Sequence, residues 1–183
     1  MINNQLLNEL HIGKIIKKIA QSKGISSKRI AATLNSYKQN SDQLFCKDDM
    51  NIDDLIRISY LLEYNVLYVI VKEYLPHLSF SIQTLWPETY LKKIDIKSND
   101  LLCGKSKDDC DFLCQILIGE EIKKVADINN WNRQEVAEKI RSTSATVLYL
   151  YTRKSIKLKK LIQISESFQY DFISNVYLSK ICF

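Results

Sequence analysis

The side chains best suited to chemistry in this sequence form a basic run near its C-terminal end. The run comprises Arg153, Lys154, Lys157, Lys159 and Lys160. Positive side chains grouped in this way neutralise the phosphates of a nucleic acid, which is the main source of salt-dependent affinity. A basic run is also typical of a solvated surface, so the run alone leaves both interpretations open.

Two short segments carry side chains suited to reading base edges. They are Lys38, Gln39, Asn40 and Gln43 in the first segment, and Thr143, Ser144 and Thr146 in the second. Glutamine and asparagine bond adenine edges bidentately, lysine reaches guanine, and small hydroxyl side chains approach bases closely but discriminate weakly. The alternatives are a solvated polar helix face for the first segment and a packed protein contact for the second.

Catalysis and metal binding have little support. The two histidines, His11 and His77, stand apart, and no Gly-rich phosphate loop, nucleophile elbow or HExxH motif occurs. Cys110 and Cys114 are spaced i, i+4 with Cys103 upstream, but no histidine lies nearby and the CxxC spacing of zinc sites is missing. We therefore expect no enzymatic activity, no metal, no cofactor and no small-molecule ligand.

The composition favours helices. The chain has 183 residues, 46% of them apolar, with only 4 Gly and 2 Pro, and its net charge of +5 allows a polyanionic partner without requiring one. It has no apolar run long enough to span a bilayer, and its N-terminus lacks a signal-peptide pattern. Its five cysteines form no disulfide-like framework. These features predict an all-α protein in the cytoplasm, without a membrane partner.

The elements that must position these side chains occur twice. The two copies align without a gap over some sixty residues, and each residue of the first copy lies 106 positions before its counterpart in the second. Matched pairs include Ile12 with Ile118, Gly13 with Gly119, Ala31 with Ala137, Ser36 with Ser142, and Tyr64 with Tyr170. The matched residues are mostly apolar at helical spacing, so one supersecondary unit is used twice.

Each copy is expected to contain a series of short helices. In the first copy, helix one ends at Gly24, helix two is capped by Ser26 or Ser27, helix three covers about 37–45 and helix four about 52–62. In the second copy, Asn132 caps helix two with Glu135 completing a capping box. Ser142 or Thr143 caps helix three, and helix four begins near residue 158.

The middle pair of helices is the most informative part of each copy. Ala31 and Ala137 are expected where two short helices approach closely, with Asn35 and Arg141 at the tight turn that follows. An apolar-Ala stretch, a turn with serine and a short helix together form the helix-turn-helix pattern. In such units the second helix of the pair lies in the DNA major groove.

Each half resembles the lambda-repressor-like (Cro/repressor, Xre-type) helix-turn-helix family. The resemblance is carried by IGEEIKKVADINNWNRQEVAEKIRSTSATVLYLYTRKSIKLKKLIQIS in the second copy, and by HIGKIIKKIAQSKGISSKRIAATLNS and IDDLIRISYLLEYN in the first. It implies compact α-helical domains and DNA contact through the third helix. The family usually dimerises on inverted half-sites. The expected partners are therefore double-stranded DNA and a second copy of the chain.

The resemblance also implies which residues contact phosphate, because the loop after helix three and the start of helix four pass along the backbone. Besides the basic run of the second copy, this predicts Lys28, Arg29 and Lys47 in the first copy. The first copy differs by carrying Asp48, Asp49, Asp53 and Asp54 at the matching places, which should cap helix four or weaken phosphate contact. Ser41 and Arg141 also depart from the family pattern, which favours an aliphatic residue at the first position and a turn-tolerant residue at the second.

We expect a first helix-turn-helix domain at 1–78, a connector at 79–108 and a second helix-turn-helix domain at 109–183. The preferred function is a sequence-specific, repressor-like transcriptional regulator that binds DNA through tandem helix-turn-helix domains. The alternative is an antitoxin-like protein-interaction or dimerisation module in which one or both copies have lost DNA binding. In that case the aromatic residues Tyr149 and Tyr151 serve for docking.

Overall fold

The computed structural model describes residues 4–34, 41–73, 117–173 and 176. The expected base-contacting residues Lys38, Gln39 and Asn40, the connector at 79–108 and the cysteines at 103, 110 and 114 lie outside this part of the chain. Every regular element in the described part is a helix, in agreement with the all-α class expected from composition.

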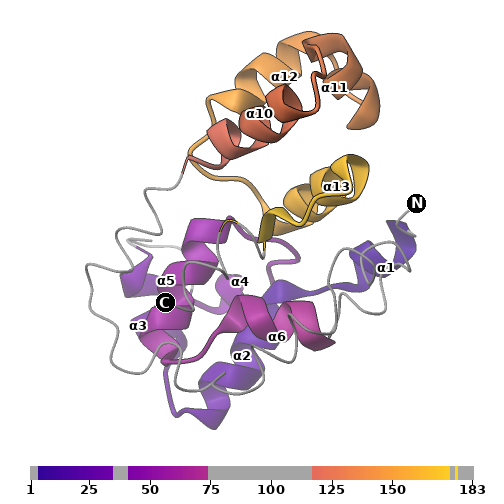
Figure 1. Ribbon diagram of the computed structural model, residues 1–183. Helices are drawn as coiled ribbons and strands as arrows, with labels where there is room; N and C mark the ends of the chain where they lie inside the picture. The colour runs from indigo at the N-terminus through magenta and orange to yellow at the C-terminus, as the bar shows by residue number, and fades with distance from the viewer. Residues whose placement is uncertain (1–3, 35–40, 74–116, 174–175, 177–183) are drawn as a thin grey trace.

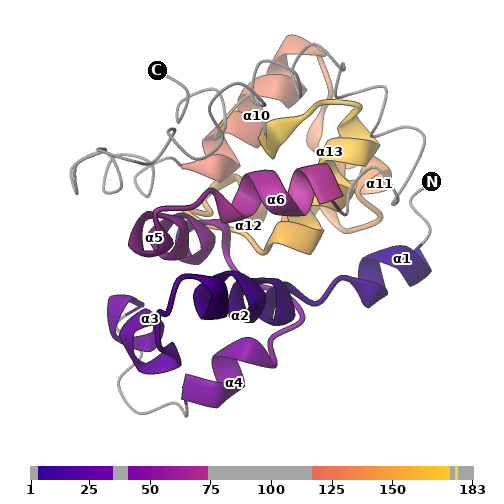
Figure 2. The ribbon, with the colours of Figure 1, turned by 90° about the horizontal axis from the view of Figure 1, so that it is seen from below.

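The helices fall into two groups, which Figure 1 shows with the second repeat above the first. The first group contains α1 (Asn4–Glu9), α2 (Ile12–Ser22), α3 (Ser27–Thr33), α4 (Ser41–Phe45), α5 (Ile52–Leu62) and α6 (Val66–Glu73). The second contains α10 (Ile118–Ile128), α11 (Arg133–Lys139), α12 (Ser144–Tyr151) and α13 (Leu158–Phe168). In Figure 2 α4 lies at the edge of the first repeat, away from α10 and α13.

The 106-residue register of the sequence is confirmed at the level of the helices. The helices α2, α3 and α5 begin and end 106 residues before α10, α11 and α13, respectively. The helices α4 and α12 end at matching residues, and Ala31 and Ala137 occupy the same place in α3 and α11. The two repeats are therefore built from the same elements in the same order.

The starts of α3, α11 and α12 are capped by short polar side chains, as expected. Ser26 caps α3 and accepts a hydrogen bond from the amide of Arg29 at 3.4 Å. Asn132 and Glu135 form the predicted capping box, with the Glu135 carboxylate accepting from the Asn132 amide at 2.7 Å. Of the two residues considered for α12, Thr143 is the cap.

Left-handed backbone ends several elements at matching positions. Glu63 (φ 47°) follows α5 and Gln169 (φ 51°) follows α13, while Gly24 (φ 65°) and Asn130 (φ 57°) follow the first helix of each repeat. Arg141, at the turn between α11 and α12, has a φ of 52°. The departure noted in the sequence is thus real, because a non-glycine residue holds a turn that needs left-handed geometry.

A close backbone contact sets the angle between the first and third helices of each repeat. The Gly119 amide donates to the Arg153 carbonyl oxygen at 3.0 Å, and the Gly13 amide donates to that of Lys47 at 2.8 Å. A Cβ atom at Gly119 would lie 2.4 Å from the carbonyl oxygen of Leu150. Only glycine lets the start of α10 approach the end of α12 this closely.

Candidate nucleic-acid interface

The two repeats meet at a short backbone seam, which is formed by the residues just before and at the start of α5 and α13. The Ile52 amide donates to the Ile156 carbonyl oxygen at 3.1 Å, and the Leu158 amide donates to that of Met50 at 2.9 Å. Between these bonds Asn51 stands opposite Lys157 in an antiparallel bridge. The seam is thus a minimal piece of antiparallel sheet that joins two otherwise helical units.

The seam has the symmetry of a homodimer interface. Asn51 and its partner Lys157 are 106 residues apart, and so are Ile52 and Leu158. Exchanging the repeats therefore converts each of the two hydrogen bonds into the other. An interface is isologous when both units use the same patch, so that every contact between the two units occurs a second time with the units exchanged. Such an interface has a local two-fold axis. That axis passes through the bridge.

Apolar side chains close the seam on the inside. Met50, Ile52, Ile156 and Leu158 are all buried, at 3%, 0%, 8% and 0% exposure. They belong to one hydrophobic cluster that extends through both repeats. Burial of an apolar side chain on folding contributes roughly 1.5–3 kcal/mol before the entropy of ordering is subtracted. The repeats are thus packed together as well as hydrogen-bonded.

Polar side chains at the flanks also join the repeats. The Asp49 carboxylate accepts hydrogen bonds from the Met50 amide at 2.9 Å and the Lys159 amide at 3.2 Å. The Ser155 hydroxyl donates to the carboxylate of Asp53. Asp49 matches Ser155 and Asp53 matches Lys159 in the 106-residue register, so exchanging the repeats places one contact on the other. The symmetry therefore extends beyond the backbone bridge.

Asp48, Asp49 and Asp53 of the first repeat therefore have roles that the sequence did not predict. Asp49 and Asp53 bind the second repeat, while Asp48 pairs with the imidazole of His11, and this hydrogen bond lowers the pKa of Asp48. Burial raises the pKa of Asp49, and burial followed by repulsion from Asp53 raises that of Asp54. Local patterns in the sequence do not show the roles of Asp49 and Asp53, because their partners lie more than a hundred positions away.

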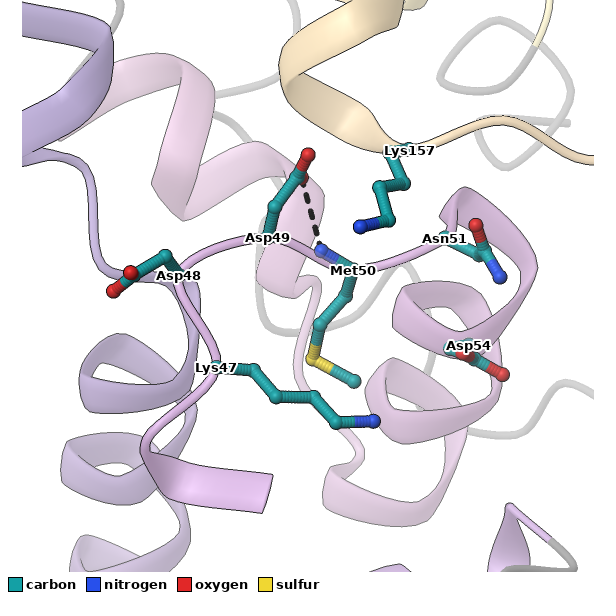
Figure 3. Close-up of a pocket in the computed structure, with 7 residues that line it drawn as sticks. All are labelled: Lys47, Asp48, Asp49, Met50, Asn51, Asp54 and Lys157. Carbon is teal, nitrogen blue, oxygen red and sulfur yellow. Dashed lines mark hydrogen bonds between the residues drawn. The ribbon is translucent and has the colours of Figure 1, made fainter. Parts of the chain in front are cut away.

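The seam borders an open cavity of about 360 Å³, which Figure 3 shows in close-up. Lys157 reaches into it from the start of α13 toward the segment at Asp49 and Met50, and Lys47 and Asp54 lie on the side of the first repeat. Opposite charges thus face each other here. Lys47, one of the predicted phosphate contacts, is half-buried beside this cavity.

The basic run of the second repeat is divided by the seam. Arg153 and Lys154 are exposed just after α12, and the Arg153 guanidinium lies 4.2 Å from the centre of the Tyr149 ring. Lys157 and Lys159 stand beside Asp49, whose carboxylate feels the charge of both lysines. Lys160 is half-buried. Arg153 and Lys154 are consequently the members of the run best placed for an external polyanion.

The exposed face of α12 contains the residues expected to contact bases. Thr143, Ser144 and Thr146 are exposed, as are the large side chains of Leu148 (53%) and Tyr149 (58%). The opposite face is buried through Val147 and Leu150. A helix with this distribution is anchored on one side and presents the other side to solvent.

In the first repeat the expected contact residues are distributed over α3 and α4. Lys28 and Arg29 are exposed in the first turn of α3, and Gln43 is exposed on α4. The 106-residue register relates α4 to α12, so Gln43 and the exposed face of α12 belong to equivalent helices. Sequence reasoning named these residues, but it did not foresee that a seam would fix the two helices relative to each other.

Comparison of the chain with known protein families, with curated proteins and with solved structures finds no match. The described residues contain no helix long and apolar enough to cross a membrane, and no group of three metal-ligating side chains. The seam and the equivalent helices α4 and α12 are therefore the features that bear on function.

Proposed function

We propose that this protein is a sequence-specific, repressor-like DNA-binding regulator in which two helix-turn-helix units on one chain act as the two halves of a dimer. The observation that carries the proposal is the isologous seam between residues 49–53 and 155–159. Two-fold symmetry in a DNA-binding protein mirrors an inverted repeat in its operator. A two-fold within one chain lets one molecule contact both half-sites.

The contacts divide into two kinds, and base contacts give specificity whereas phosphate contacts position the protein. Phosphate contact is assigned to Arg153 and Lys154 in the second repeat and to Lys28 and Arg29 in the first, which are exposed. Base contact is assigned to α12 in the second repeat. In the first repeat it is assigned to α4, which carries Gln43, and to Lys38, Gln39 and Asn40 before it. The two half-sites should differ in sequence, because the exposed residues of the two helices differ.

A protein-interaction role is the second candidate. Leu148 and Tyr149 are exposed large apolar side chains next to each other on α12, and such residues often mark a docking surface. In that role the chain would bind a protein partner through α12 and would show no preference among DNA sequences.

The two roles are separated by selection from a pool of random DNA duplexes with the full chain. We expect enrichment of one consensus made of two inverted and unequal halves, with centres about one helical turn or 10 bp apart. Recovery of duplexes without any consensus, or with two halves in the same orientation, would refute the proposal. Poly(dI-dC) is added as a competitor, so that duplexes bound only through non-specific electrostatic attraction are removed.

A further inference from the structure

The exposed side of α12 forms a continuous stripe of small and apolar side chains. Its members are Ser144, Ala145, Leu148, Tyr149 and Thr152, all exposed and spaced i, i+1, i+4, i+5 and i+8. Residues at these spacings share one face of a helix. From Ser144 to Tyr151 the helix carries no charged and no amide side chain.

This composition limits the ways in which α12 could read DNA. Guanine is read bidentately by arginine or lysine, and adenine by asparagine or glutamine, and α12 has none of these. The hydroxyls of Thr143 and Thr146 already share a hydrogen bond, at 2.9 Å between the oxygens, and Thr143 also accepts from the Thr146 amide. The base feature that remains for an apolar stripe is the C5-methyl group of thymine.

The charge around the stripe fits DNA better than it fits a protein. Residues 139–160 contain seven basic residues and no acidic one, with α12 in their centre. The matching stretch of the first repeat, 33–54, contains two basic and five acidic residues. An apolar stripe that basic residues flank on both sides along the chain is complementary to a major groove, where methyl groups lie between two phosphate backbones.

We propose that the second repeat recognises a thymine-rich half-site by contact between the apolar stripe of α12 and thymine methyl groups. Leu148 and Ala145 are the methyl-contacting residues. Tyr149, with the Arg153 guanidinium over its ring, joins the stripe to the phosphate-binding end of the helix. This inference rests on the proposed function, and it names the class of sequence that one half of the site takes.

The test uses a duplex of the consensus selected by the full chain, synthesised once with thymine and once with deoxyuridine at every thymine position. The two duplexes differ only in the C5-methyl groups. Burial of one methyl group is equivalent to about a four-fold change in affinity. With two or more methyls in contact, we expect the thymine duplex to bind about ten-fold tighter or more in a fluorescence titration.

Two substitutions assign the effect to α12. Leu148→Ala should reduce the preference for thymine by about four-fold or more, and Leu148→Met should keep it, because a methionine side chain still reaches the methyl group. Gln163→Ala, at an exposed position of α13 outside the proposed DNA contacts, should leave the preference unchanged. Leu148 is half-exposed, so Leu148→Ala is expected to fold; if its circular dichroism shows unfolding, Leu148→Gln takes its place.

The outcomes separate the inference from the function on which it rests. If the wild-type chain binds no duplex selectively, the proposed function fails and the inference fails with it. If it binds the thymine and deoxyuridine duplexes equally, only the inference is overturned. A preference that survives in the Leu148→Ala and Leu148→Gln variants would also overturn it, since the methyl groups would then be read elsewhere.

Discussion

Replacing Gly119 by alanine should lower the free energy of unfolding by about 3 kcal/mol, at the upper end of the usual cost of overpacking. The added Cβ would lie 2.4 Å from the Leu150 oxygen and 2.5 Å from the Tyr151 oxygen. Both are backbone atoms at the end of α12, so neither can rotate away. The hydrogen bond from Gly119 to Arg153 would be strained at the same time.

The expected change in stability is opposite in sign to the change that helix propensity predicts. Alanine is favoured over glycine in a helix by about 1 kcal/mol, so helix propensity alone predicts that Gly119→Ala stabilises the protein. A thermal melt followed by circular dichroism should instead show a drop of about 6–12 °C. Gly13→Ala should behave alike, because its Cβ would lie 2.6 Å from the backbone of Phe45. The control replaces the exposed neighbour Glu120 by alanine, which adds no atom at the contact with α12. A higher melting temperature for Gly119→Ala than for the wild-type chain would contradict the close contact between α10 and α12.

The double variant Arg153→Ala, Lys154→Ala should bind DNA about fifty-fold more weakly at 0.1 M salt, whatever the sequence of the duplex. Each neutralised phosphate contributes about 0.9 to the slope of log affinity against log salt, so two lost contacts flatten the slope by roughly 1.8. The structure exposes both side chains just after α12. The measurement is a set of titrations between 50 and about 300 mM salt, where the slope of B-DNA binding is well defined.

The matched control is Lys157→Ala with Lys159→Ala, which removes the same charge from the same basic run. These lysines stand beside Asp49, so part of their charge is already balanced within the protein. Their loss should flatten the slope by less than the loss of Arg153 and Lys154. Equal slopes of log affinity against log salt for the two variants would mean that the seam does not divide the run. If neither variant changed this slope, the run would be only a solvated surface.

Much of the fold could be predicted because the signals are local. The capping box at Asn132 and Glu135 follows from the residue types at these positions. The start of α5 at Ile52 and its end at Leu62 follow from apolar periodicity over a few turns. The sequence pattern also predicts the tight turn at Arg141, although arginine is not typical of the left-handed geometry found there. Matching these patterns between copies made each assignment firmer than it would be in a single copy.

The seam could not be predicted in the same way. It depends on pairing between residues more than a hundred positions apart, and Asn51 and Lys157 carry no local sign of a bridge. The sequence pattern alone predicts that the aspartates near it cap helix four or weaken phosphate contact. In the structure Asp49 accepts the Lys159 amide from the other repeat instead, which is a long-range contact. The long-range pairing also decides which basic residues stay open to a partner, as with Arg153 compared with Lys157.

The central claim is that one chain, folded about the local two-fold at the bridge between Asn51 and Lys157, occupies both halves of a DNA site. The most direct test is native mass spectrometry of the full chain with the duplex that it selects. We expect one chain per duplex over the whole titration, with no intermediate that carries a second chain. A complex of two chains per duplex would contradict the claim, because each half-site would then be bound by a separate molecule.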